Sequence, residues 1–188
     1  GFLPPLSVGG STYGGMPVAA IDQPGNTDSR WFYESALPPD PTLSAGLIPD
    51  DPVLPESGLD RKSLLPVPLM FEVDLWINLP LLTDHRVVGV NGTLVNGTLW
   101  AVTNQQRFFG QRVNGAAAAA EIAAIPELAA TRAFAILSLE SFQYVGGPRF
   151  NAAYCDGRPL VLLSTDPLAL DRLGLSWINE ARVAAGFA

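Results

Sequence analysis

Residues 160–174 read Leu-Val-Leu-Leu-Ser-Thr-Asp-Pro-Leu-Ala-Leu-Asp-Arg-Leu-Gly, and the helical pattern continues through Arg182. The four large apolar residues at the start are typical of a buried strand. The polar corner Ser164-Thr-Asp-Pro167 then predicts the start of a helix, because aspartate is a preferred N-cap and proline is tolerated at the first helical position. The segment therefore predicts a buried strand that passes directly into a helix, with Gly186 as its stop.

The expected helix has an apolar face that would pack on a sheet. Its members are Leu170, Leu173, Trp177, Ile178 and Ala181. Asp166 has two interpretations. It is a structural cap, worth about 1 kcal/mol, or a ligand-binding carboxylate, because ligands of open α/β sheets bind beyond the carboxyl ends of the strands. A carboxylate there would repel a phosphate and would suit a metal, a hydroxyl or a cationic group.

Strands and helices alternate over the last two thirds of the chain. Phe71–Leu79 is expected to be a strand that Pro80 ends, and Ala133–Leu139 a second apolar strand. Between them, propensity favours a helix over Asn114–Ile125 with Asn114 as its cap, followed by a helical turn from Pro126 to Arg132. The alternation predicts an α/β fold with a mixed, mainly parallel sheet flanked by helices.

The N-terminal third has a different composition. Residues 1–68 contain 12 of the 17 prolines, and proline removes backbone donors and restricts the residue before it. We expect a long irregular segment that wraps over the core, with one short strand at Met16–Ile21. The whole chain, 1–188, is interpreted as a single domain whose α/β core is 69–188.

Residues 91–103 allow two structures. The Asn96-Gly97 pair between β-prone residues favours a hairpin. A helical period, by contrast, places Val90, Leu94, Val95, Leu99 and Val102 on one face, with Asn91 as a possible cap. The sequence leaves both alternatives open.

Composition excludes several classes of partner. The net charge is -7 and Lys62 is the only lysine, which argues against nucleic acid and anionic membranes as partners, because both need clustered positive charge. No apolar run has the length of a membrane span. Cys155 is the only cysteine, so no iron-sulfur cluster is expected within this chain. The cytoplasm is slightly favoured, and export stays open.

A second polar strand end follows the first expected strand. Asp84 and His85 put a carboxylate beside the only group whose ordinary pKa is near neutrality. If this strand end lies beside the last one, then His85, Asp84 and Asp166 could bind a metal or serve as acid and base groups. A structural or surface histidine is the simpler interpretation.

Four ordered motifs resemble the DUF362 family, a domain of unknown function found in bacteria and archaea. They are Ile77-Asn-Leu-Pro-Leu-Leu-Thr-Asp-His85, Asn91-Gly-Thr-Leu-Val-Asn96, Gly147-Pro148 and Ser164-Thr-Asp-Pro-Leu-Ala-Leu-Asp171. The resemblance covers about Leu69 to the C-terminus. It implies an α/β fold and a ligand site whose candidates are Asp84, His85, Asn96, Thr165, Asp166 and Asp171.

The chain departs from the family pattern at three positions. Lysine is usual in the family where this chain has Thr83 and Val95, and an aspartate is common near Ser138. The family's N-terminal half has no counterpart here. The resemblance therefore implies a diverged ligand-binding or assembly domain without the full catalytic site, and whether it is an enzyme stays open. The alternative is a metal-assisted enzyme, redox or hydrolytic, that uses His85, Asp84 and Asp166. Another subunit or a missing N-terminal half could cover the sheet edge.

Overall fold

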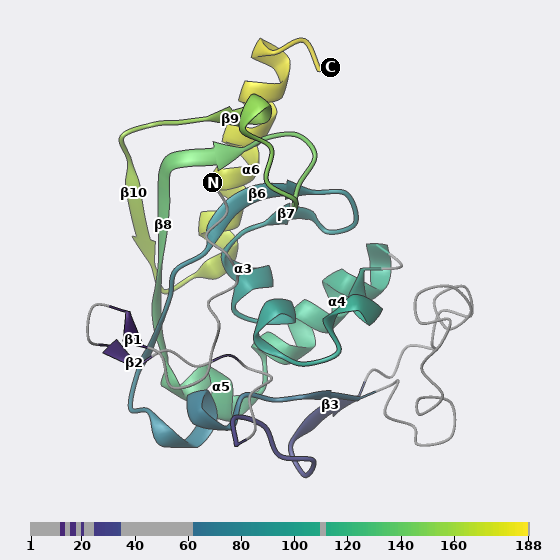
Figure 1. Ribbon diagram of the computed structural model, residues 1–188, viewed down its shortest axis with the longest axis vertical. Helices are drawn as coiled ribbons and strands as arrows, with labels where there is room; N and C mark the ends of the chain where they lie inside the picture. The colour runs from purple at the N-terminus through teal and green to yellow at the C-terminus, as the bar shows by residue number, and fades with distance from the viewer. Residues whose placement is uncertain are drawn as a thin grey trace.

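The computed structural model describes residues 12–13, 16–17, 20, 25–34, 62–109 and 112–187. Its central sheet has six strands: β5 Trp76–Asn78, β6 Leu81–His85, β7 Gly89–Asn91, β8 Arg132–Gln143, β9 Cys155–Asp156 and β10 Val161–Ser164. The long strand β8 runs through the middle of this sheet (Figure 1). The mixture of helices and a mixed sheet confirms the predicted α/β class.

Strand directions follow from the pairing with β8. β5 and β6 pair with it in parallel, one after the other along its length. β9 and β10 pair with β8 antiparallel, and β7 pairs antiparallel with β6. From Leu81 to Thr83 the partner residue moves from Ser138 to Gln143, and β8 bends in this region (Figure 1).

The remaining elements lie outside the central sheet. Two small antiparallel pairs are β1 Thr12–Tyr13 with β2 Met16–Pro17, and β3 Phe32–Glu34 with β4 Lys62–Leu64. The helices are α3 Thr93–Asn96, α4 Arg112–Ala123, α5 Pro126–Thr131 and α6 Pro167–Ala184. Short helical turns are Pro68–Glu72, Leu99–Ala101, Gln105–Phe108 and Ala152–Tyr154. The expected strand at 16–21 includes β2, and its residues 18, 19 and 21 lie outside the described residues.

Helix α6 covers one face of the sheet. Along β8, Ala135, Leu137 and Leu139 are buried, in the alternation expected of a strand with one covered face. They form a core cluster with Leu82, Phe142, Leu170, Ile178 and Ala181. The predicted helical face is correct at Leu170, Ile178 and Ala181, but wrong at Leu173, which is 47% exposed. Gly174 is buried instead, because it packs directly on Leu82.

A second core joins the helices to the N-terminal strands. Its largest fully buried members are Phe108, Leu99, Ile122 and Leu128. The predicted helix over 114–125 is confirmed as α4, although it begins at Arg112, so Asn114 lies inside the helix and is not its cap. The helical turn after Pro126 is confirmed as α5.

The expected strand at Phe71–Leu79 is largely wrong. Pro68 stands in the first turn of a π-helical turn that extends to Glu72, and proline favours helical starts. The strand begins only at Trp76, and Pro80 interrupts it rather than ending it, because β6 resumes at Leu81. The apolar strand predicted at Ala133–Leu139 is confirmed within β8, which is longer by several residues.

Residues 91–103 form no hairpin at Asn96-Gly97. The chain leaves β7, forms α3 and continues into the turn at Leu99–Ala101, so the helical alternative is correct over its first turn. Gly92 holds the N-cap position proposed for Asn91. The buried residues Val95, Leu99 and Val102 share the second core, and this packing outweighs the local hairpin preference.

Candidate functional site

The two polar strand ends lie at opposite ends of helix α6. Asp166 begins α6, and Arg182, near the other end of that helix, binds Asp84 with Nη2 3.1 Å from Oδ2. At about 1.5 Å per residue, these helix positions are roughly 24 Å apart. The sequence interpretation assumed that both strand ends share an edge, but β10 is antiparallel to β8 while β6 is parallel to it.

This separation corrects the metal hypothesis. A shared metal would need His85, Asp84 and Asp166 within a few ångströms of one point. Asp166 lies too far from the other two, so these three residues do not form one metal site. Among the described residues, no group of three or more His, Cys, Asp or Glu side chains is arranged to hold a metal ion.

Asp84 anchors the turn after β8. Its carboxylate accepts hydrogen bonds from the backbone N–H groups of Gly146 at 3.2 Å and Gly147 at 2.8 Å, and it pairs with Arg182. The residue is 5% exposed. A Cβ at Gly147 would overlap the Asp84 backbone, so this close approach requires glycine. The carboxylate therefore has a structural role.

His85 closes the turn between β6 and β7. Its Nδ1 accepts hydrogen bonds from the N–H groups of Val87 at 3.1 Å and Val88 at 3.3 Å, which places the ring proton on Nε2. The ring packs on Phe109 with centroids 4.8 Å apart. Burial, followed by the charge of Arg86, lowers the pKa of His85, and Asp84 opposes this shift only partly. The imidazole is therefore neutral at physiological pH.

Asp171 joins α6 to α3. Its carboxylate accepts hydrogen bonds from the N–H groups of Thr93 at 2.5 Å and Leu94 at 2.9 Å, so it caps α3 from another element. Burial raises the pKa of Asp171, while these backbone bonds act in the opposite direction. A Cβ at Gly92 would overlap this carboxylate. Asp171 is therefore a tether inside the fold.

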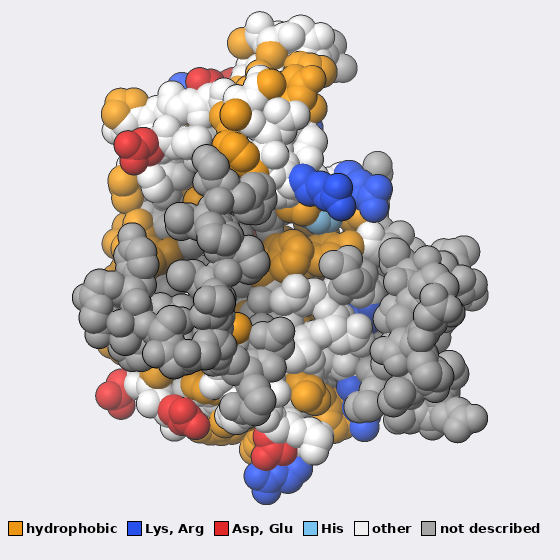
Figure 2. Space-filling view, viewed as in Figure 1, with side chains coloured by type: hydrophobic (Ala, Val, Ile, Leu, Met, Phe, Trp, Pro, Cys, Tyr) orange, Lys and Arg blue, Asp and Glu red, His pale blue; other side chains and the backbone are white. Residues whose placement is uncertain are grey.

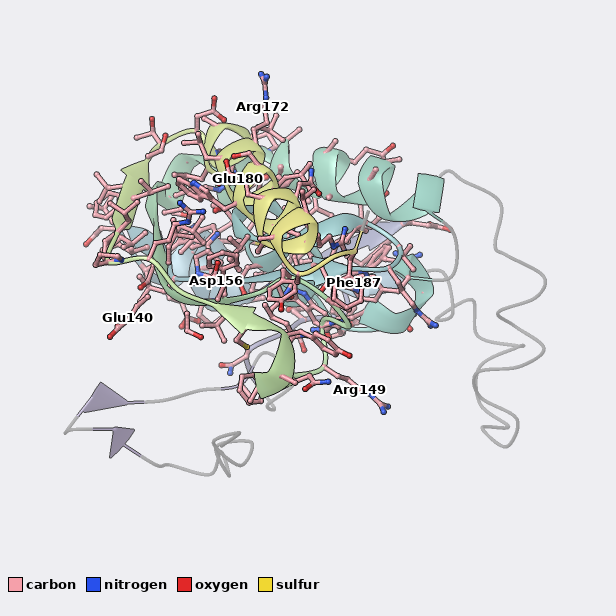
Figure 3. All side chains as sticks on the ribbon, turned by 90° about the horizontal axis from the view of Figure 1, so that it is seen from above. Glu140, Arg149, Asp156, Arg172, Glu180 and Phe187 are labelled. Atoms are coloured by element: carbon pink, nitrogen blue, oxygen red, sulfur yellow. The ribbon has the colours of Figure 1, made fainter. Side chains whose placement is uncertain are left out.

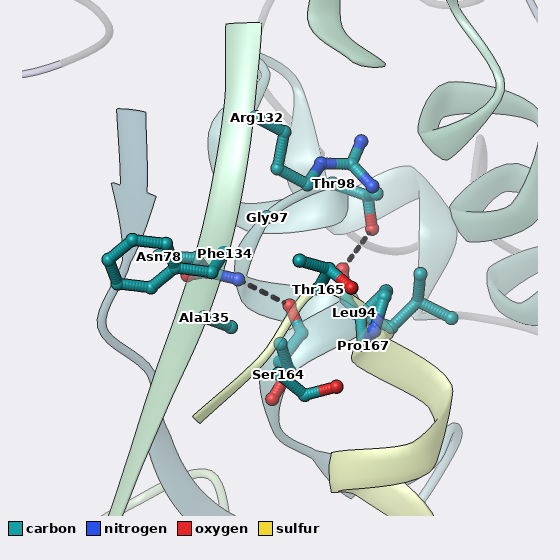
Figure 4. A pocket seen from close by; sticks show the side chains of 11 residues that line it. Asn78, Leu94, Gly97, Thr98, Arg132, Phe134, Ala135, Ser164, Thr165 and Pro167 are labelled. Atoms are coloured by element: carbon teal, nitrogen blue, oxygen red, sulfur yellow. Dashed lines mark hydrogen bonds between the residues drawn. The ribbon is translucent and has the colours of Figure 1, made fainter. Parts of the chain in front are cut away.

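Asp166 is confirmed as the N-cap of α6. Its Oδ1 accepts hydrogen bonds from Leu168 N at 2.9 Å and Ala169 N at 3.2 Å. Its own N–H donates to the Ser164 hydroxyl at 2.9 Å. Thr165 lines a small cavity between β8, α3 and the start of α6, shown in Figure 4. The cavity volume of about 10 Å³ is close to the space of one water molecule.

Asn96 lines a larger, open pocket of about 450 Å³, which is within the range of small-molecule sites. The pocket takes residues from three of the four sequence motifs. Its lining is Leu79, Leu81, Asn91, Asn96, Trp100, Pro148 and Arg149. Leu79 and Leu81 are 66% and 76% exposed, so this pocket has an accessible apolar floor.

Polar groups stand around that floor. Asn91 is held in place, because its Oδ1 accepts a hydrogen bond from Trp100 Nε1 at 2.6 Å. Asn96 donates through Nδ2 to Asn78, and no described residue donates a hydrogen bond to its Oδ1. Arg149 is exposed and makes no ion pair with any described residue, and Figure 3 shows it projecting outward from the connection between β8 and β9. Figure 2 shows apolar side chains at the surface of this part of the molecule.

Sequence reasoning identified one pocket residue, Asn96, as a candidate and missed Leu79, Leu81, Trp100 and Arg149. The available signal was the Gly146-Gly-Pro148 turn, which carries Arg149 immediately after it. That turn type is too common to mark a site by itself. It becomes informative only in the folded chain, where Pro148 lies beside β6.

No family model, curated protein or solved structure matches the chain. Among the described residues, no helix has both the length and the apolar character needed to cross a membrane.

Proposed function

We propose that this chain is a diverged DUF362-like domain that binds a small molecule in the open pocket around Leu79, Leu81 and Arg149. The observation that carries this proposal is the convergence of three motif segments on one accessible pocket. Pockets of this size, with an apolar lining and a few convergent polar groups, are the usual form of small-molecule sites.

The lining indicates the chemistry of the ligand. Arg149 offers a planar cation that matches a carboxylate or phosphate, and Asn96 Oδ1 can accept a hydrogen bond from a hydroxyl or amine. The leucine floor and Trp100 favour an apolar body. The ligand class is therefore an acid with an apolar group.

The loss of both family lysines supports binding without the family's full site. Thr83 carries no charge, and its hydroxyl oxygen accepts a hydrogen bond from Asn91 Nδ2 at 3.4 Å. Val95 is 5% exposed and packs in the second core. Neither position supplies a cation, so Arg149 is the charged group at this pocket.

Titration of the full chain with phenyl phosphate and phenylacetate, followed by calorimetry, tests the proposal. Both probes pair an aromatic ring with an acid. We expect Arg149→Gln to weaken binding by about tenfold or more, since a charged hydrogen bond contributes about 1.5–3 kcal/mol. Leu81→Ser should weaken it as well, because the apolar floor is lost.

Arg172→Gln is the matched control. Arg172 is an exposed arginine of α6, and Figure 3 shows it on the opposite side of the molecule from Arg149. Its substitution should leave affinity unchanged. Equal losses in the two arginine variants, or no heat with either acid, would refute the proposed site.

Assembly is a second candidate, favoured by the uncovered face of the sheet. On the face away from α6, β6 and β10 present Leu81, Val161 and Leu163, which are 76%, 67% and 64% exposed. Among the described strands, β10 pairs only with β8, so one of its edges can take a partner strand. We propose that a second copy of this chain is that partner.

A further inference from the structure

The connection between β8 and the helical turn at Ala152–Tyr154 brings Arg149 to the open pocket. Pro148 and Arg149 both lie on this connection and both line the pocket. Figure 1 shows the connection reaching back beside β6. A segment outside the strands keeps one conformation only where its backbone groups are bonded. The groups that bond this segment therefore decide where the Arg149 guanidinium lies.

Gln143, the last residue of β8, binds this connection at three backbone groups. Its Nε2 donates to Val145 O at 3.1 Å and to Arg149 O at 2.8 Å, and its Oε1 accepts from Asn151 N at 2.6 Å. The residue is 2% exposed, so water competes little for these bonds. Two of the three bonds flank Arg149 and fix the backbone from which its side chain projects.

Asp84 holds the other part of the connection. Its carboxylate accepts from Gly146 N and Gly147 N, so it fixes the glycine turn and not the segment that carries Arg149. The two anchors lie close together, because Gln143 pairs with Thr83 across the sheet. The division of labour between them leaves the Arg149 segment to Gln143.

We propose that Gln143 determines the preference of the open pocket for acids over neutral analogues, because it holds Arg149 in place there. This inference rests on the proposed function and names the residue that sets its selectivity. A charged group that is already in position loses less conformational freedom on binding than one on a mobile segment. Gln143 is not among the residues that line the pocket, so it is a positioning residue that acts through Arg149.

Calorimetric titration of the full chain with phenylacetate and with phenylacetamide tests this role. The two probes have nearly the same shape and differ in charge. Gln143→Met keeps the length of the side chain and removes the amide. We expect this variant to bind phenylacetate about tenfold more weakly, as for the loss of a charged hydrogen bond. Its affinity for phenylacetamide should equal that of the wild type.

A double variant separates positioning from an independent effect. If the loss passes through Arg149, then Gln143→Met combined with Arg149→Gln should bind phenylacetate as weakly as Arg149→Gln alone. Additive losses, or a Gln143→Met variant that keeps the wild-type preference for the acid, would overturn the proposal. A wild type that binds no acid would refute the open pocket itself and this inference with it, so the two failures are distinguishable.

Thr131→Val is the matched control for stability. Thr131 Oγ1 donates to Leu69 O at 2.7 Å, so this variant also loses a side-chain hydrogen bond to a distant backbone group. Thr131 is the last residue of α5 and does not line the pocket. The variant should lower Tm and leave both affinities unchanged. An equal loss of acid preference in Thr131→Val would show that general destabilisation causes the effect.

Hydrogen exchange of the wild type applies if Gln143→Met fails to fold. The amide of Asn151 donates to the buried Gln143 Oε1, so it exchanges when the connection opens. Saturating phenylacetate should slow this exchange several-fold, because the acid binds the state in which Arg149 is held. Saturating phenylacetamide should leave the rate unchanged. The same rate with and without phenylacetate would overturn the proposal.

Discussion

Asp84 and Asp171 are carboxylates of the sequence motifs at 77–85 and 164–171, and both face backbone N–H groups of other elements. Asp84 holds the turn at Gly146 and Gly147, while Asp171 holds the start of α3. A sequence can show a carboxylate after a strand or on a helix. It cannot show which distant N–H groups that carboxylate meets, because those contacts depend on the packing of separate elements. Both were expected as ligand-binding candidates, and both have structural partners.

His85 makes a pH-dependent contribution to stability, and it is the only histidine in the chain. Because its pKa in the folded chain is below its ordinary 6.5, the unfolded chain binds the proton more readily between these two values. Stability should therefore fall as pH drops below about 6.5, by up to about 1.4 kcal/mol per pH unit. Urea unfolding between pH 5 and 8 measures this slope.

His85→Gln is the comparison that isolates the effect. The variant loses the titrating ring, so its stability should change less steeply than that of the wild type over the same window. All carboxylates are common to both proteins and cancel in the difference. Parallel pH profiles for the two proteins would contradict the neutral, buried state of His85.

At the scale of elements, the start of α6 was predictable and the direction of β10 was not. Asp166, Pro167 and Gly186 act locally, through N–H groups and backbone angles within a few residues, and the structure confirms their cap, first-turn and stop positions. The apolar run 160–163 predicted a buried strand, and this prediction is wrong at Val161 and Leu163, which are exposed on the face away from α6, whereas Leu162 packs against the core cluster. Such a run also says nothing about the direction of the strand. The predicted metal site is wrong because it required β6 and β10 to run in the same direction, so that Asp84, His85 and Asp166 would meet at one edge of the sheet.

The two aspartates of α6 should differ in their contribution to stability. Asp166→Ala removes an exposed cap and should cost about 1 kcal/mol. Asp171→Ala leaves the N–H groups of Thr93 and Leu94 without acceptors in a buried place and should cost about 2–4 kcal/mol. Chemical denaturation at pH 7 gives both values. A loss for Asp171→Ala no greater than that for Asp166→Ala would show that the tether between α3 and α6 is dispensable.

At the scale of the whole molecule, the sheet is covered unequally. Helix α6 packs on one face, and the core residues of β8 point toward it. The other face presents Leu81, Val161 and Leu163 at high exposure. The alternation of apolar and polar residues along β8 indicates a sheet with one covered face. That pattern does not encode which partner would pack on the other face. The free edge of β10 makes self-pairing geometrically simple, since two antiparallel copies of one strand are related by a two-fold axis.

Sedimentation velocity over a range of chain concentrations tests this pairing. We expect the wild type to form dimers, and Leu163→Glu to remain monomeric, because a charge on the joined apolar face would be desolvated. Leu163 is 64% exposed, so the substitution should leave the monomer folded. Val183→Glu is the matched control: Val183 is 71% exposed on α6, and this variant should associate as the wild type does. A wild type that is monomeric at every concentration, or equal loss of association in both variants, would show that the β10 edge and its face do not join two copies.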